Sequence, residues 1–264
     1  GNSPDILHET PLHARLVKLK SPVLTNDDIE SLRNSKLDSF QTAALEISFP
    51  AEGGGNALKK STEGLCLNAE KMIAEGKNVI ILSDKKISEG HAPIPSLLAV
   101  SAVNRHLIKK GLRTSASLIV ETGEAREVMH YVLLLGYGVT AVNPYLALET
   151  VANLANSEYL EAKIPVVKAV ENYVKAVCKG ILKVMSKMGI STLRSYRGAQ
   201  IFEALGLAKD FVDEYFTGTA SRIAGIGMEE IAAEALERYR KRLDIDEESA
   251  SAAQLDSGGQ YYFR

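Results

Sequence analysis

The stretch that decides the fold class is Asn78-Val79-Ile80-Ile81-Leu82-Ser83. A continuous apolar run with polar residues at each end is typical of a strand covered on both faces, as the strands of parallel sheets are. Residues 58–75 before it and 94–110 after it have the 3.6-residue periodicity of helices, and Gly111 supplies a stop for the second. The local order is therefore helix, buried strand, helix.

The same alternation continues on both sides of this strand. We predict further strands at 43–49, 116–121 and 139–143 and further helices at 124–135 and 145–154. A β-α-β-α-β-α-β-α order predicts right-handed crossovers and a mostly parallel sheet, either open or barrel-like. Any site is then expected beyond the carboxyl ends of the strands.

Beyond residue 156 the pattern becomes helical. Apolar residues step by three and four from Val167 to Met188, which predicts a long helix, either a core helix or a dimerising coil. We interpret residues 190–195 as a fifth strand, 198–205 as its helix and 228–242 as a final amphipathic helix. The expected fold class is α/β, with a mostly parallel sheet of about five strands, flanking helices and additional C-terminal helices.

The two ends of the chain differ from this middle part. Residues 1–20 mix Pro, His and Lys and are expected to form a linker or an arm. Thr25 and Asp28 then have the spacing of a capping box that begins a short helix. Residues 244–264 are acidic and then contain Gly and Ser, so we expect a mobile tail. One central α/β domain is expected over residues 21–243.

Composition excludes several classes of function. The formal net charge of the 264 residues is -2, which gives no overall positive field for nucleic acid or an anionic membrane. No apolar run approaches the roughly 20 residues of a membrane span. The only cysteines, Cys66 and Cys178, are too few for a zinc or iron–sulfur site built from thiolates, and we expect both to be reduced. We therefore expect a soluble, cytoplasmic chain.

Two charged or glycine-rich patterns have a structural and a functional interpretation. Glu52-Gly53-Gly54-Gly55-Asn56 precedes a helix, where free backbone N–H groups can hold a phosphate, but it matches no nucleotide motif and a flexible loop is favoured. Lysines recur every fourth residue from Lys175 to Lys187. A solvated helix face is favoured there, and an anionic partner or another domain of the same protein is the alternative.

No catalytic signature is visible in the sequence. His106 and His130 lie between apolar neighbours, with no nucleophile or orienting carboxylate fixed beside them, so we expect satisfied core or interface histidines rather than general bases. The five histidines have no HxxxH or HExxH spacing, and there is no GxSxG motif.

Polar residues follow two strands that are expected to be neighbours. The run Glu121-Thr122-Gly123-Glu124-Ala125-Arg126 ends one strand and opens a helix, and Asn143-Pro144-Tyr145 holds the same position after the next strand. Capping of the helix by Thr122, with Glu124 near its positive end, explains these residues without chemistry. The alternative is a polar cluster or a contact with another domain, formed by Glu121, Thr122, Glu124, Arg126, Asn143 and Tyr145.

Eight short sequence motifs follow one another along the chain: HAPIPSLLAV at 91–100, GLRT at 111–114, VETGEAREV at 120–128, GYG at 136–138, NPYLA at 143–147, KMGIST at 187–192, SYRGAQIFEA at 195–204 and YFTGT at 215–219. In these motifs and in their order, the chain resembles the central domain of the large subunit of glutamate synthase, over about residues 21–234.

The resemblance implies an enzyme that makes two glutamates from glutamine and 2-oxoglutarate with reducing electrons. It implies two partner domains in the same enzyme. An N-terminal glutaminase domain releases ammonia with a Cys nucleophile, and a C-terminal domain with FMN and a 3Fe–4S cluster uses it. The central domain lies between them, helps to build the ammonia passage and has a topology akin to a degenerate flavin barrel. No cofactor is expected in this chain.

The chain also departs from the pattern of that family. It begins Gly1-Asn2-Ser3, without the Cys nucleophile, and ends about where the flavin domain is expected to begin. Family members often carry histidines where this chain has Asn104, Arg105 and Met129. The resemblance carries over no catalytic, cofactor-binding or metal-binding residue. We expect a non-catalytic spacer. The alternatives are a free-standing flavin- or phosphate-binding barrel-like enzyme that uses the Gly53–Gly55 loop, and an interaction protein that works alone.

Overall fold

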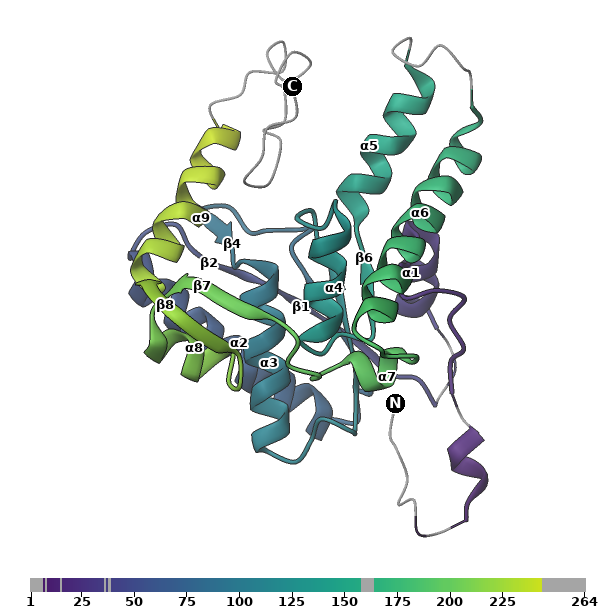
Figure 1. Cartoon of the computed structure of the whole chain (residues 1–264), viewed down its shortest axis with the longest axis horizontal. Helices are drawn as coiled ribbons and strands as arrows, with labels where there is room; N and C mark the ends of the chain where they lie inside the picture. Colours follow the sequence, from purple (N-terminus) through teal and green to yellow (C-terminus); the bar gives the residue numbers. More distant parts are fainter. Residues whose placement is uncertain are drawn as a thin grey trace.

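The structure, a computed structural model, describes residues 7, 9–14, 16–35, 37, 39–157 and 164–243. After a short 3-10 helix at Pro11–Ala14, its helices are α1 (Asn26–Arg33), α2 (Gly54–Ala74), α3 (Ser96–Lys109), α4 (Val128–Gly136), α5 (Tyr145–Asn156), α6 (Val166–Lys187), α7 (Leu193–Tyr196), α8 (Lys209–Tyr215) and α9 (Met228–Leu243) (Figure 1). Its strands are β1 (Thr42–Glu46), β2 (Ser48–Pro50), β3 (Val79–Ser83), β4 (His91–Pro93), β5 (Ser117–Glu121), β6 (Ala141–Asn143), β7 (Glu203–Leu207) and β8 (Ala220–Ile226).

The main sheet has four parallel strands in the order β1-β3-β5-β6. The strands lie side by side in the order in which the chain makes them, so each crossover joins neighbours. That sequential order is the order of a (β/α) barrel segment, whereas a doubly wound sheet reverses its strand order part-way. The predicted α/β class, with a barrel-like parallel sheet and flanking helices, is confirmed.

The two faces of the sheet are covered differently. Side chains alternate along each strand, so neighbouring residues enter different cores. One set joins the large core with α2, α3, α4 and α6: Ile80, Leu82, Leu118, Val120 and Val142. The other set forms a small core with Leu24 and Ile29: Val79, Ile81, Ile119 and Ala141. In a closed barrel this second face would meet the remaining strands, and here α1 and the segment before it cover it.

Two of the predicted elements need a shift of their boundaries. The strand expected at 43–49 is interrupted at the buried residue Ile47, whose N–H donates to Ser83 O and whose carbonyl accepts from Ile94 N. The chain there leaves the main sheet, and β2 pairs antiparallel with β4 instead. The helix expected from residue 124 begins at Val128, because Glu127 and His130 form its capping box.

The expected fifth strand and its helix are wrong. Residues 190–195 contain the start of α7, which Thr192 caps by accepting from Ser195 N at 3.2 Å. Residues 203–207 are strand rather than helix, and they pair parallel with β8 in a separate two-stranded sheet. Glu203, Ala204 and Leu205 favour a helix locally, but the left-handed φ of +75° at Gly206 and the pairing with β8 override that preference.

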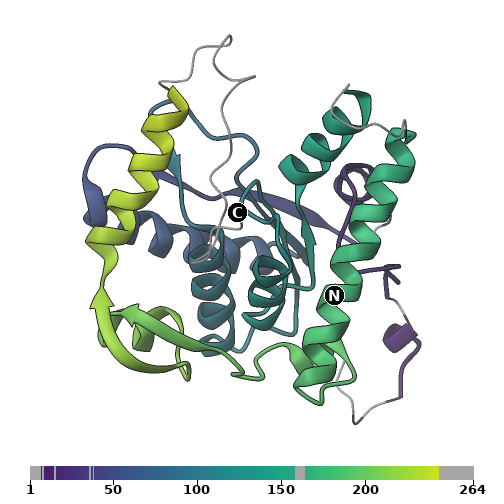
Figure 2. The same ribbon diagram turned by 45° about the horizontal axis from the view of Figure 1, so that its top comes forward.

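Helices α1, α2, α3, α5, α6 and α9 lie about where the sequence predicts them, whereas α8 was not predicted. Thr25 and Asp28 form the predicted capping box, with Thr25 N donating to Asp28 Oδ2 at 2.9 Å. Helix α6 packs as a core helix through Val177, Ile181 and Met185. Figure 2 shows α5 and α6 side by side, with α9 at the other side of the molecule. Within the described residues, no helix combines the length and the apolar content that a membrane span requires. The tail at 244–264 lies outside the described residues.

Candidate functional site

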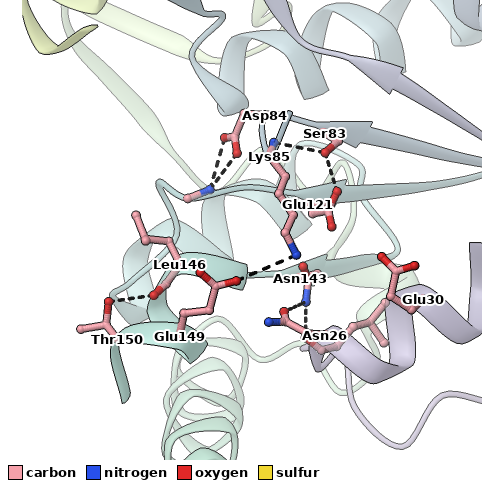
Figure 3. A network of polar contacts seen from close by, with 12 residues as sticks. Asn26, Glu30, Ser83, Asp84, Lys85, Glu121, Asn143, Leu146, Glu149 and Thr150 are labelled. Carbon is pink, nitrogen blue, oxygen red and sulfur yellow. Dashed lines mark hydrogen bonds and ion pairs between the residues drawn. The ribbon is translucent and has the colours of Figure 1, made fainter. Parts of the chain in front are cut away.

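The carboxyl ends of β3, β5 and β6 bring polar side chains together (Figure 3). The parallel register places Ser83 beside Glu121 and Glu121 beside Asn143. The residues that follow these strand ends complete a group that we name the carboxyl-end cluster: Ser83, Asp84, Glu121, Thr122, Asn143 and Tyr145. Because parallel strands end at one edge, side chains far apart in sequence meet here, which is where barrel-like proteins bind ligands.

Glu121 is the most deeply buried acid of this cluster, with a side chain that is 0% exposed. Its Oε2 accepts hydrogen bonds from the Arg33 guanidinium and from the Ser83 hydroxyl. Its Oε1 has no hydrogen-bond partner among the described residues. A buried carboxylate needs a paired cation, and Arg33 supplies it. Arg33 is the last residue of α1, so the helix that covers the inner face of the sheet also carries the counter-charge.

Asp84 follows β3 and binds the turn that follows β5. Its Oδ2 accepts from Thr122 Oγ1 at 2.5 Å and its Oδ1 accepts from Gly123 N at 2.9 Å. Burial raises the pKa of Asp84 to about 6, although the hydrogen bonds from Thr122 and Gly123 act in the opposite direction. Thr122 Oγ1 accepts from Glu124 N at 3.1 Å, so it closes a turn before α4 and does not cap that helix.

Asn143 and Tyr145 connect the cluster to its surroundings. The Asn143 amide group donates to Leu24 O and to Asn26 Oδ1, both at 3.0 Å, and its Oδ1 has no partner among the described residues. Asn143 thus ties β6 to the segment that covers the inner face. Burial, and then the nearby Asp84 carboxyl, raise the pKa of the Tyr145 hydroxyl, which therefore stays protonated.

Lys85 is a cation of this region that was not among the residues predicted from the sequence. Its Nζ lies 3.9 Å from Glu149 Oε1 and 5.4 Å from the centre of the Tyr145 ring. Figure 3 shows Lys85 extending between β3 and Glu149 on α5. Ser83, Asp84 and Lys85 follow the same strand-end rule that indicated Glu121 and Asn143, so that rule would have found them. Arg33 has no local signal, because it reaches Glu121 from 88 residues away.

Glu124 and Arg126 do not lie in the carboxyl-end cluster. Both line a separate pocket of about 400 Å³ between the starts of α3 and α4. Glu124 Oε2 accepts from Ser96 N at 2.7 Å, at the first turn of α3, and its Oε1 lies 4.0 Å from Arg238 Nη2. The backbone of Arg126 is bound as well, with its N–H donating to His130 Nδ1 and its carbonyl accepting from the Tyr173 hydroxyl.

The glycine-rich loop is a packing feature. Gly53, with a φ of +100°, precedes α2, and Gly55 N donates to Glu229 Oε2 at 2.9 Å. A Cβ atom on Gly55 would lie 2.8 Å from Glu229 Cα, closer than Cβ contacts in real proteins. Only glycine lets α9 approach α2 this closely. The carboxylate of Glu229 therefore occupies the helix N-terminus at which a phosphate would otherwise bind.

The remaining candidates are satisfied as the sequence predicted. His106 Nε2 lies 2.6 Å from Glu70 Oε2, and Lys110 Nζ lies 3.4 Å from the other oxygen of that carboxylate. His130 accepts from two backbone N–H groups, and burial lowers the pKa of its imidazole. Lysines 175, 179, 183 and 187 form an exposed face of α6. No group of three or more His, Cys, Asp and Glu side chains suitable for a metal occurs in the part of the chain that the structure describes.

Comparison with known proteins gives the chain a family. Residues 1–208 match the glutamate synthase central domain. The chain belongs to this family. It is 43% identical to the large chain of the NADPH glutamate synthase of Bacillus subtilis, over 99% of the chain and 17% of that protein. It is 38% identical to the ferredoxin-dependent glutamate synthase of Pyropia yezoensis, over 99% of the chain and 18% of that protein.

This central domain is a small part of the proteins that it matches. It is 37% identical to the NADH glutamate synthase of Schizosaccharomyces pombe, over 100% of the chain and 13% of that protein. The chain thus spans less than a fifth of the length of these relatives. The recombinant flavin-binding domain of baker's yeast flavocytochrome b2 is similar at a TM-score of 0.42 and 17% identity, over 67% of the chain and 38% of that structure, a likeness too low to carry an argument.

Proposed function

We propose that this central domain is the non-catalytic spacer of a glutamate synthase. It aligns a glutaminase domain with a synthase domain that carries FMN and a 3Fe–4S cluster, and it contributes to the passage of ammonia between them. Both cofactors belong to the synthase domain under this proposal. The family match and the short span of the chain within its relatives support it. Free Cys66 and Cys178 fit a reducing cytoplasm, where we place the enzyme.

The observation that carries the proposal is that side chains of the domain itself bind the carboxyl-end cluster and the N-terminus of α2, two places where such folds hold ligands. At the carboxyl ends of the strands, the Arg33 guanidinium binds the buried Glu121 carboxylate. At the N-terminus of α2, the Glu229 carboxylate binds Gly55 N. Groups that bind each other in this way hold the elements of the domain in place. A spacer requires that rigidity, because fixed separation of two sites keeps ammonia on its path.

The spacer role is tested in a full-length glutamate synthase that carries this domain. Arg33→Ala is expected to loosen the inner face of this domain, and it changes no residue of the two proposed neighbouring domains. We expect fewer glutamates formed per glutamine hydrolysed, with unchanged FMN content and unchanged glutaminase turnover. An unchanged ratio in a variant whose domain is measurably less stable would refute the spacer role.

The rival function, a free-standing flavin- or phosphate-binding enzyme, is tested on the 264-residue chain alone. The spacer proposal predicts a colourless protein without glutaminase or reductase activity. It also predicts no saturable thermal shift with FMN, nucleotides or sugar phosphates, because Glu229 already holds the N-terminus of α2. A stoichiometric flavin spectrum, or a large saturable shift that Glu229→Gln increases, would favour the rival.

A further inference from the structure

A second pocket lies at the opposite end of the sheet from the carboxyl-end cluster. Helices α3 and α4 run back along the parallel strands, so their C-terminal ends lie where the strands begin. Between these ends, α7 and the segment after α8 lies a pocket of about 380 Å³, which we name the aromatic pocket. Pockets for small molecules have volumes of about 300–1,000 Å³, so this space suits a ligand of one or two rings.

Aromatic side chains form the walls of this pocket. The Tyr137 ring stacks on Phe202 with centroids 6.0 Å apart and meets the edge of Phe216 at 5.2 Å. Gly136 allows this wall to form, because a Cβ atom there would lie 2.6 Å from the Phe202 ring. Walls of this kind favour flat apolar rings, which gain stacking and edge-on contacts as well as burial.

Two tyrosine hydroxyls at the pocket, those of Tyr196 and Tyr215, are buried and have no hydrogen-bond partner among the residues that the structure describes. Tyr196 lines the pocket and is 0% exposed, and its hydroxyl is unpartnered among the residues that the structure describes. By contrast, Tyr131 bonds Tyr173 at 2.8 Å and Tyr137 bonds Thr219 at 2.7 Å. Buried hydroxyl groups in folded proteins are nearly always paired, so these two exceptions at one pocket point to a polar atom that arrives with a ligand. Burial raises the pKa of Tyr196 to about 12, so the group is a neutral donor or acceptor.

The described residues that line the pocket include two cations and no acid. Arg105 and Lys109 lie on α3 at the pocket. Neither forms an ion pair with a carboxylate among the described residues. Arg105 instead donates to the carbonyl oxygen of Asp213, which leaves its charge in place. Lys109 is exposed. Both cations also line a neighbouring pocket with Glu63 and Glu214, but neither forms an ion pair among the described residues. Two positive charges without an ion pair beside an apolar space favour an anion.

From these three features we propose that the aromatic pocket binds a small planar aromatic carboxylate. Its rings lie against Tyr137 and Phe202, its carboxylate faces Arg105 and Lys109, and a second polar group pairs with the Tyr196 hydroxyl. The site is separate from the carboxyl-end cluster, and its existence does not depend on the spacer role. Its place at the far end of the sheet makes it a site for a regulatory ligand rather than for a substrate.

The test is a fluorescence titration of the 264-residue chain with 6-hydroxy-2-naphthoate, a flat two-ring carboxylate with a hydroxyl at its other end. We expect saturable 1:1 binding. Lys109→Glu should weaken it at least fivefold, since an attraction becomes a repulsion. Tyr196→Phe should weaken it about threefold to tenfold, the loss of one hydrogen bond. Two matched controls outside the pocket, Lys60→Glu and Tyr239→Phe, should leave the affinity unchanged.

Two comparisons among ligands separate the parts of the proposal. Neutral 6-hydroxy-2-naphthamide should bind the wild-type chain at least fivefold more weakly than the carboxylate, and Lys109→Glu should not weaken it further. The ligand 2-naphthoate, without the hydroxyl, should bind wild type and Tyr196→Phe equally. The proposal is wrong if no ligand saturates the chain, or if Lys109→Glu and Tyr196→Phe bind 6-hydroxy-2-naphthoate as tightly as the two controls do.

Discussion

The two ends of the parallel sheet have opposite characters. At the carboxyl ends, side chains from α1, β3, β5 and β6 bind one another, and even the acceptor atoms left unpaired belong to side chains held through another atom. At the other end, the described lining of the aromatic pocket holds two unpaired hydroxyls and two cations but no carboxylate.

The difference follows from what covers each end. Helix α1 and the segment before it bring Arg33 and Asn26 onto the carboxyl-end cluster. At the other end, the rings of Tyr137, Phe202 and Phe216 pack against each other and leave space beside Tyr196. A cluster of charges is stable without a ligand only when its members pair. An apolar pocket is stable without one because its walls contact each other.

The largest expected effect tests whether the carboxyl-end cluster is held by the ion pair. Arg33→Ala leaves the buried Glu121 carboxylate without its cation and should lower the free energy of unfolding by about 3 kcal/mol. Urea unfolding measures this loss. Glu30→Ala, which removes the exposed partner of the same arginine, should cost less than about 0.5 kcal/mol. Equal losses in both variants would mean that the Glu121 pair does not hold this end of the sheet.

The second prediction concerns the contact that closes the glycine-rich loop. Gly55→Ala places a Cβ atom 2.8 Å from Glu229 Cα, so α9 must move away from α2, at a cost of about 2–3 kcal/mol in the free energy of unfolding. Gly64 is a matched control on the same helix, because a Cβ atom there meets nothing within 4 Å. Gly64→Ala should raise stability by about 0.5–1 kcal/mol. Urea unfolding of both variants gives the comparison, and two changes of the same sign would contradict it.

The third prediction uses the pH dependence of stability. The pKa of Asp84 is raised from 3.8 to about 6 in the folded protein, so between these values the folded state binds more protons than the unfolded state. The contribution of Asp84 to stability is therefore full below about pH 4 and is lost as the pH rises to about 6. Relative to Asp84→Asn, the wild type should lose about 2 kcal/mol between pH 4 and pH 7. Urea unfolding across this range measures the difference, and parallel curves would contradict the raised pKa.

The smallest expected effect contrasts a paired with an unpaired hydroxyl. Tyr131→Phe removes a hydroxyl that bonds Tyr173 and Ala125 O, and should cost about 1 kcal/mol in the free energy of unfolding. Tyr196→Phe removes an unpartnered hydroxyl, and without a ligand it should be neutral or raise stability by up to about 1 kcal/mol. Thermal unfolding in ligand-free buffer compares the two. A loss in Tyr196→Phe as large as that in Tyr131→Phe would show that its hydroxyl is already satisfied.

The regular part of the fold was predictable because its signals are local. Strands β3 and β5 are apolar runs that are covered on both faces of the sheet. In α3, α5, α6 and α9 the apolar residues recur with a helical period. Strand β8 gave no such signal, because most of its side chains are exposed and its residues do not alternate. Strand β7 resembled a helix because Glu, Ala and Leu favour one, and only its pairing with β8 makes it extended.

Four of the six residues of the carboxyl-end cluster were predictable for a related reason. Glu121, Thr122, Asn143 and Tyr145 follow adjacent parallel strands, and strand ends share an edge, so their proximity follows from the order of the elements. Glu124 and Arg126 follow the same strand, but they line a separate pocket beside the starts of α3 and α4. Whether the separate domain expected over residues 21–243 has those bounds stays a prediction.

By itself, the sequence determined the parallel sheet, the capping of α1 at Thr25, the burial of α6 and the resemblance to the family. These features depend on residues within a few positions of each other, where periodicity and propensity act. Only the tertiary structure decided that Arg33 meets Glu121 and that Glu229 meets Gly55, across separations of 88 and 174 residues. It alone also left Tyr196 unpaired. Such partners depend on how whole elements pack, because no local preference selects a contact between distant parts of the chain.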